Sequence, residues 1–169
     1  YLYLRHVDLR SQFVNGFTFD QDTANWWSSR SKEAKAAVTA QDCQPCDSVE
    51  NVVVDFFQWI KEIANGDEIC LWSQGSDFDI AILRNICQTF QIDLPVSYKN
   101  FRDHRTFFLE GARIILDAAL QPYDPSRAYS LVEPYEGDGV AHDPIYDCKR
   151  SIYSTWQMMK HLKCLNIGN

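Results

Sequence analysis

The order of hydrophobic patterns between residues 48 and 90 limits the fold of this chain more than any other feature. "SVENVVVDFFQWIKEIANG" has a helical apolar face, with Ser48 as its N-cap and Gly66 after its end. The residues of that face are Val49, Val52, Val53, Phe56, Ile60 and Ile63. "EICLWSQ" follows as a short buried strand, and "GSDFDIAILRNICQTF" returns to a helical pattern. Helix, strand and helix in this order predict an α/β fold, a mixed sheet flanked by helices.

The rest of the chain continues this alternation. We expect one or two short helices in "DQDTANWWSSRSKEAKAAV", capped by Asp22, then strand and turn in "VSYKNFRDHR" and a helix in "RTFFLEGARII". A long loop is expected from Leu120 to Val140, and a half-buried strand over the first five residues. With 169 residues and 46% hydrophobic content, residues 1–169 are expected to form a single domain.

Composition excludes several classes of protein. A net charge of −7 argues against a broad basic surface for duplex DNA, but not against an enzyme whose metal ions face phosphates. The apolar runs are too short to span a bilayer. The segment Cys43–Cys46 has metal-ligand spacing without a second pair, so zinc is not expected. The other cysteines predict reduced, buried thiols in a cytoplasmic protein: Cys70, Cys87, Cys148 and Cys164.

The last helix begins with an unusual pair of residues. In "GVAHDPIYDCKRSIYSTWQMMKHL", Asp143 is a good N-cap and Pro144 suits the first helical position. His142 and Asp147 then take the two positions of a hydrophobic staple, so an imidazole and a carboxylate are expected side by side. A polar staple and a general base beside an acid both fit this pattern. The stripe expected to face the core is Ile145, Cys148, Ile152, Trp156, Met159 and Leu162.

A second acidic site lies in "CLWSQGSDFDIAIL". A strand ends at a Gly–Ser turn, and a helix is expected to begin at Ser76 or Asp77, which places Asp79 in its first turn. That carboxylate would lie near the carboxyl end of a strand, where α/β sheets build their sites. A capping box of Ser76 and Asp79 is the competing structural interpretation.

The two segments together resemble known motifs. "GSDFDIAIL" is similar to the second motif, and "AHDPIYD" to the His-x(4)-Asp third motif, of DEDDh-type 3′–5′ exonucleases. These enzymes belong to the DnaQ-like superfamily with a ribonuclease H-like fold, and the small phage and bacterial DexA type is the more similar group. "TANWWSSRSKEAKAAV" and "NFRDHRT" extend the resemblance over most of the chain.

The resemblance implies a function and a site. Asp79 and Asp147 would bind two Mg²⁺ or Mn²⁺ ions, and His142 would activate a water that attacks a phosphodiester. The expected substrate is the 3′ end of single-stranded DNA or RNA. A non-catalytic module that binds nucleic-acid ends or proteins on a degenerate exonuclease fold is the alternative.

Several aromatic and polar residues are candidate substrate contacts. Phe78 neighbours Asp79 and could stack on a base, with Ser76 beside it, and Arg105 could contact phosphate. Trp26 and Trp27 could also stack on a base, although paired aromatics beside a helix more often pack a core.

One motif of the resembled family is missing. Its first motif, Asp-x-Glu on a central strand, has no counterpart, because "VDLR" at residues 7–10 has arginine where glutamate is needed. We therefore expect a domain truncated at its N-terminus, which lacks its central strand. A missing N-terminal segment or a complementing chain would supply this strand. A homodimer is also among the expected assemblies.

Overall fold

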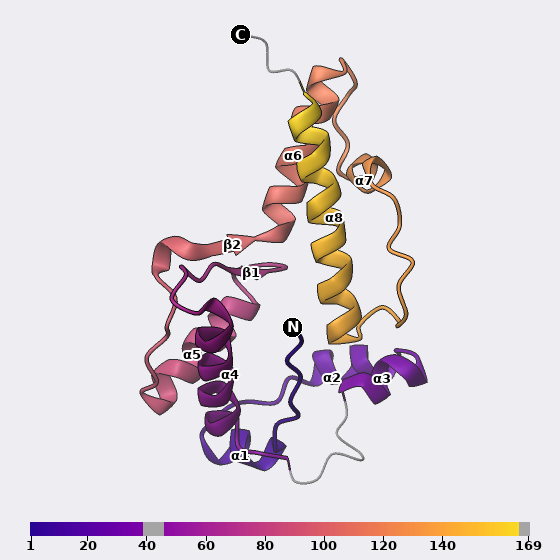
Figure 1. Ribbon diagram of the computed structural model, residues 1–169. Helices are drawn as coiled ribbons and strands as arrows, with labels where there is room; N and C mark the ends of the chain where they lie inside the picture. The colour runs from indigo at the N-terminus through magenta and orange to yellow at the C-terminus, as the bar shows by residue number, and fades with distance from the viewer. Residues whose placement is uncertain (39–45, 166–169) are drawn as a thin grey trace.

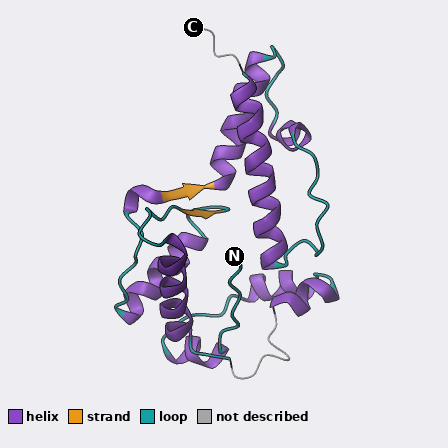
Figure 2. Cartoon of the chain, in the orientation of Figure 1, coloured by secondary structure: helices purple, strands orange, loops and turns teal. Residues whose placement is uncertain are grey.

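The computed structural model describes residues 1–38 and 46–165, and it is a mixed α/β protein that is mostly helical (Figure 1; Figure 2). Within these residues the elements, in chain order, are α1 (Leu9–Val14), α2 (Gln21–Ser28), α3 (Lys32–Val38), α4 (Val49–Ala64), β1 (Leu71–Ser73), α5 (Asp79–Phe90), the 3-10 helix η1 (Tyr98–Asn100), β2 (Phe101–Asp103), α6 (His104–Ala118), α7 (Pro125–Ala128), the 3-10 helix η2 (Tyr129–Leu131) and α8 (Pro144–Cys164). In this part of the chain, no helix has the length and apolar character that crossing a membrane requires.

The sheet of the described chain consists of β1 and β2, which pair in parallel. Leu71 lies opposite Phe101 and Ser73 opposite Asp103, and α5 forms the connection between the two strands. Parallel pairing brings the carboxyl ends of both strands to one edge. The turn into α5 and the start of α6 therefore meet there. The sheet lies between the α4–α5 pair and the α6–α8 pair (Figure 1).

Two hydrophobic clusters hold the helices together. One joins α4 to α5 through Val53, Phe57 and Cys87. The other joins α6, α7 and α8, and its buried members are Phe108, Ala112, Ala128 and Met158. Gly111 permits the close approach of α6 to α8, because a Cβ there would lie 2.9 Å from the Met158 Cγ.

The predicted apolar stripe of α8 is confirmed at Leu162, which packs against the second cluster, but it is wrong at Ile152, Trp156 and Met159. Met158 is fully buried, whereas Ile152 is 70% exposed and Trp156 50% exposed. The segment before α8 explains the shift, because the Gln157 amide pairs with the backbone of Glu133 through two hydrogen bonds of 3.0 Å. Because these hydrogen bonds satisfy the buried amide, the face of α8 that carries Gln157 and Met158 can pack inward.

The N-terminal segment is not the strand that its alternation predicts. Residues 1–6 have no regular structure, and Tyr3 packs instead between Phe56 and Trp59 of α4. The Tyr3 hydroxyl donates to the Val52 carbonyl at 3.1 Å and to the Asp55 carboxylate at 2.9 Å. Burial, followed by the Asp55 hydrogen bond and charge, raises the pKa of Tyr3 to about 12. A side chain thus attaches this segment to a helix where backbone pairing was expected.

Several smaller expectations are also corrected. Asp20, rather than Asp22, caps α2, since its carboxylate accepts the Thr23 N–H. The expected loop after Leu120 contains α7 and η2. Of the thiols expected to be buried, only Cys87 is; the exposed ones are Cys70, Cys148 and Cys164. Cys43 lies outside the described residues.

Candidate active site

The turn between β1 and α5 carries Asp79. Gly75 has φ +113°, a region open to glycine, and its carbonyl accepts the N–H groups of Phe78 and Asp79 at 3.0 and 3.3 Å. The helix begins at Asp79 itself, and its cap residue Phe78 makes no side-chain cap hydrogen bond. The first-turn position of Asp79 is therefore confirmed. The predicted start at Ser76 or Asp77 and the capping box are wrong.

Asp103 ties this turn to the start of α6. Its Oδ2 accepts the Ser76 N–H at 2.6 Å, and its Oδ1 accepts the Thr106 N–H at 2.7 Å as the N-cap of α6. Burial raises the pKa of the Asp103 carboxyl. Hydrogen bonds from the backbone N–H groups of Thr106, Ser76 and Gly75 lower this pKa by more than burial raises it, so it lies below its ordinary value. One carboxylate therefore holds together the two chain segments that leave the sheet.

The start of α8 follows the sequence prediction closely. Asp143 is the N-cap and accepts the N–H groups of Ile145 and Tyr146 at 2.8 and 3.1 Å, with Pro144 at the first helical position. Asp147 lies in the first turn. Because Asp143 satisfies the first helical donors, the Asp147 carboxylate is not needed as a cap.

His142 contacts Asp147 through its backbone and not through its ring. The His142 N–H donates to the Asp147 Oδ2 at 3.2 Å. The imidazole instead meets two tryptophans edge-on, with ring centroids 4.9 Å from Trp26 and 6.3 Å from Trp27. His142 has φ +75°, which is costly for a residue with a Cβ. The predicted contact between the His142 imidazole and the Asp147 carboxylate is therefore wrong.

The charges of two acidic residues act on one thiol. Loss of solvation around the thiol group, followed by the negative charges of Asp147 and Asp79, raises the pKa of Cys148, although the residue as a whole is exposed. Asp147 is the neighbour of Cys148 in the chain, whereas Asp79 comes from the start of α5. The start of α5 is therefore close enough to α8 for the charge of Asp79 to reach Cys148.

Asp147 has the features of a cation ligand. Its Oδ1 is buried and lacks a hydrogen bond, although the Arg150 Nη2 lies 3.1 Å away. A carboxylate oxygen in this state suits a hard divalent cation. Among residues 1–38 and 46–165, however, no three His, Cys, Asp or Glu side chains gather in a group that could hold a metal. The described chain offers carboxylates for such an ion without a full ligand set.

An aromatic group borders His142. Trp26 is 43% exposed, and its ring lies 5.0 Å from that of Trp27 in an edge-on arrangement. The Arg30 guanidinium lies over the Trp26 ring at 4.5 Å. The tryptophans therefore form a partly open surface beside α8 and not the closed core that their pairing favoured.

The expected substrate contacts are spread around the sheet edge. Phe78 is 66% exposed, so its ring is open to solvent beside Asp79. Ser76 is half-buried and engages Asp103 through its backbone. Arg105 is exposed in the first turn of α6.

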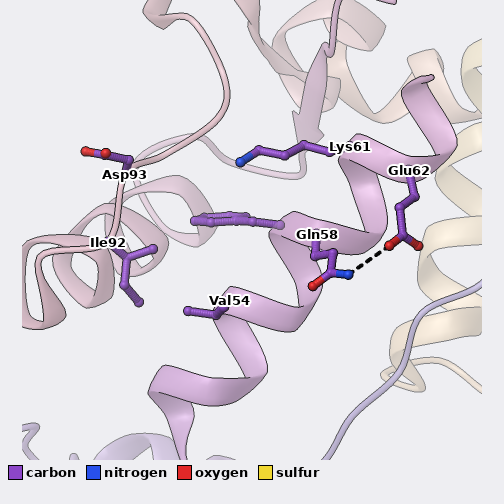
Figure 3. A pocket seen from close by; sticks show the side chains of 7 residues that line it. Val54, Gln58, Lys61, Glu62, Ile92 and Asp93 are labelled. Atoms are coloured by element: carbon purple, nitrogen blue, oxygen red, sulfur yellow. Dashed lines mark hydrogen bonds between the residues drawn. The ribbon is translucent and has the colours of Figure 1, made fainter. Parts of the chain in front are cut away.

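A hollow lies elsewhere on the molecule. It is open, has a volume of about 470 Å³ and lies between α4 and the segment after α5 (Figure 3). Its lining includes Val54, Lys61, Ile92 and Asp93, and none of the candidate site residues contributes to it. The hollow is therefore separate from the acidic residues.

Comparison with known proteins identifies the family. No curated protein and no solved structure matches the chain. The family model described as the 3′–5′ exoribonuclease Rv2179c-like domain matches residues 2–155, which include Asp79, His142 and Asp147. This match supports a hydrolytic nuclease of the DnaQ-like exonuclease superfamily. The chain belongs to the Rv2179c-like 3′–5′ exoribonuclease domain family.

Proposed function

We propose that this protein is a metal-dependent 3′–5′ exonuclease that hydrolyses phosphodiester bonds of single-stranded RNA. The observation that carries the proposal is the match of residues 2–155 to an exoribonuclease family, and the charges of Asp79 and Asp147 that both reach Cys148 support it. Two acidic helix starts whose charges both reach Cys148 agree with a nuclease site. The proposal includes a ribonuclease H-like fold for the whole domain.

Asp79 and Asp147 are the proposed metal-binding residues. Both present carboxylate oxygens, which Mg²⁺ and Mn²⁺ prefer. When bound, two such ions would stabilise the attacking and leaving oxygens of the phosphodiester. Arg150 neutralises Asp147 in the structure at 3.1 Å, so cation binding would compete with this ion pair.

His142 is the proposed general base. Its position before α8 places the ring outside the helix, while the backbone N–H on Asp147 fixes the main chain. The Trp26 ring restricts the imidazole on one side. An imidazole held beside an acidic site can accept a proton from a water molecule.

The test uses Asp79→Asn and Asp147→Asn, with Asp77→Asn as matched control. Asp77 lies in the same turn and is exposed. Both site variants should lower Mg²⁺- or Mn²⁺-dependent release of 3′ nucleotides by more than about 100-fold, since even outer-shell changes at metal sites cost 10–100-fold. Asp77→Asn should keep its activity, and all three should retain the wild-type melting temperature within a few degrees. Hydrolysis at the wild-type rate by either site variant would reject its role.

A second candidate function rests on one observation. Because the described residues gather no complete metal-ligand group, a non-catalytic module that binds RNA ends is the alternative. Such a module would bind 3′-ended RNA equally well with and without divalent ions, and would release no nucleotide. Binding and product release measured on one preparation separate the two functions.

A further inference from the structure

We infer that Asp103 and His104 are positioning residues that set the place of Asp79 relative to Asp147. They are consecutive residues at the junction of β2 and α6, and each bonds to a different one of the two segments that carry the proposed metal ligands. This inference rests on the proposed function, because it names what holds the two ligands of that site in place. Both residues act through hydrogen bonds to these segments and not on the substrate itself.

Asp103 fixes the turn that carries Asp79. It is the last residue of β2 and lies opposite Ser73, the last residue of β1. Its carboxylate reaches beyond the end of β1 and accepts the Ser76 N–H at 2.6 Å. In the same turn, the Gly75 carbonyl accepts the Asp79 N–H at 3.3 Å. These two hydrogen bonds connect the Asp79 backbone to Asp103.

His104 fixes α8 at the same junction. It is the first residue of α6 and only 8% exposed, and its Nε2 lies 3.1 Å from the Ser154 Oγ of α8. The Ser154 hydroxyl donates its one proton to the Ser151 carbonyl at 3.1 Å, so we assign the tautomer in which the His104 Nε2–H donates to the Ser154 oxygen. Stacking on Phe108 holds the imidazole in this orientation.

Ser154 and Asp147 lie on the same side of α8. They are seven residues apart, which is close to two helical turns and about 10 Å along the axis. The hydrophobic cluster between α6 and α8, which run side by side in Figure 1, supplies attraction without a fixed direction. The directional bond from His104 to Ser154 therefore sets the rotation of α8 that presents Asp147.

The two bonds act together because they start from adjacent residues. The peptide unit between Asp103 and His104 is planar and rigid, and the Thr106 N–H on the Asp103 Oδ1 at 2.7 Å holds that unit at the start of α6. Movement of the Asp79 turn away from α8 therefore strains one of the two bonds. Carboxylates that share a metal site depend on such support for their orientation.

Two variants remove these bonds and keep the helices capped. Asparagine is a good N-cap, so Asp103→Asn keeps one acceptor for the Thr106 N–H, whereas its amide NH₂ group cannot accept the Ser76 N–H. Ser154→Ala removes the acceptor of His104 from the α8 side. Wild-type melting temperatures within a few degrees confirm that both variants are folded. If Asp103→Asn does not fold, Asp103→Ser takes its place, since serine also caps a helix and offers one short oxygen.

The chain contains a matched control for each variant. Asp124→Asn removes the same charge from a residue that caps only α7. Ser130→Ala removes a hydroxyl that, like the Ser154 hydroxyl, donates to the carbonyl three residues earlier. Ser130 is exposed and its hydroxyl has no such contact with α6 among the hydrogen bonds of the described chain.

The first measurement needs no metal. Double electron–electron resonance reports the distance between nitroxides on Asp77→Cys and Lys149→Cys, two exposed positions beside Asp79 and Asp147, with every cysteine except the buried Cys87 replaced by serine. The distance distribution should broaden or shift in both site variants and stay as in the wild type in both controls. An unchanged distribution in either site variant would overturn the positioning role of the residue whose bond it removes.

Mn²⁺ binding then tests whether this geometry serves a metal site. The electron paramagnetic resonance signal of free Mn²⁺ should give an affinity lower by about 10-fold or more in both site variants, the low end of the loss expected when the support of a metal ligand is removed. Both controls should keep the wild-type affinity. An altered distance with an unchanged Mn²⁺ affinity would overturn the inference, and so would a wild type that binds no Mn²⁺. A wild type that binds Mn²⁺ but releases no nucleotide rejects the proposed hydrolysis alone.

Discussion

Replacement of His142 by alanine should separate catalysis from structure at the start of α8. The contact with Asp147 uses the His142 backbone N–H at 3.2 Å, and alanine retains that donor. If the imidazole is the general base, turnover should fall by about 100-fold or more, while the affinity for RNA and for Mg²⁺ should change little. The variant therefore keeps the backbone hydrogen bond to Asp147 and removes the proposed chemical group.

The effect on stability can be worked out from the same contacts. Alanine loses the edge-on contact with Trp26, which is worth about 0.5–1.5 kcal/mol. It keeps the cost of φ +75°, about 1–2 kcal/mol for a residue with a Cβ. His142→Gly loses the same ring contact but removes that backbone cost. The free energy of unfolding should therefore fall by about 1 kcal/mol in His142→Ala and stay near the wild-type value in His142→Gly.

The two variants should therefore have the same turnover but different stabilities. Single-turnover hydrolysis of 5′-labelled RNA should be equally slow in His142→Ala and His142→Gly, and urea unfolding should distinguish the two. His161→Ala is the control, since His161 is exposed in the last turn of α8. A His142→Ala protein that is destabilised but turns over normally would refute the catalytic role of the imidazole.

Two further predictions concern the sheet edge. Asp103→Ala should lower the free energy of unfolding by about 1–3 kcal/mol, because it removes both the cap of α6 and the bond to Ser76. Asp124→Ala removes only the cap of α7 and should cost less; equal losses in urea unfolding would reject the role of the Ser76 bond. Burial lowers the pKa of His104 in the folded protein, despite the charge of Asp103. Below about pH 6.5 the unfolded chain therefore binds more protons at this residue than the folded protein does. The free energy of unfolding should fall as the pH drops through that range. His104→Phe, which keeps the ring stacked on Phe108, should lose less stability in acid; an unchanged pH dependence of its melting temperature would contradict this account.

Local features of the sequence predicted part of this structure well. The cap at Asp143, the proline at the first helical position and the cap at Ser48 were all read from side-chain chemistry within one helical turn. Such signals are reliable because the donors and acceptors involved are neighbours in the chain. The first-turn position of Asp147 followed from these signals, whereas Asp79 lies in the first turn of α5 although the predicted start of that helix was wrong.

Contacts between distant residues could not be predicted in this way. Periodicity placed Trp156 in the core, but the pairing of Gln157 with Glu133 decides which face of α8 is buried. The approach of Trp26 to His142 likewise has no local signal, because it depends on how α2 meets α8. The pairing of Arg150 with Asp147 was readable, since a spacing of three residues places two side chains on one helical face.

A division of roles between two aspartates would allow the start of α8 to provide Asp147 as the proposed metal ligand. A helix N-terminus has free N–H donors, and a nearby carboxylate ordinarily satisfies them. Here Asp103 accepts one such donor at α6, the Thr106 N–H, and Asp143 accepts two at α8, the N–H groups of Ile145 and Tyr146. Asp147 accepts only the His142 N–H among the hydrogen bonds of the described residues, so oxygen lone pairs remain for a cation. A carboxylate committed to capping would have to break a helix start to bind an ion. A separate capping residue one turn away removes that conflict.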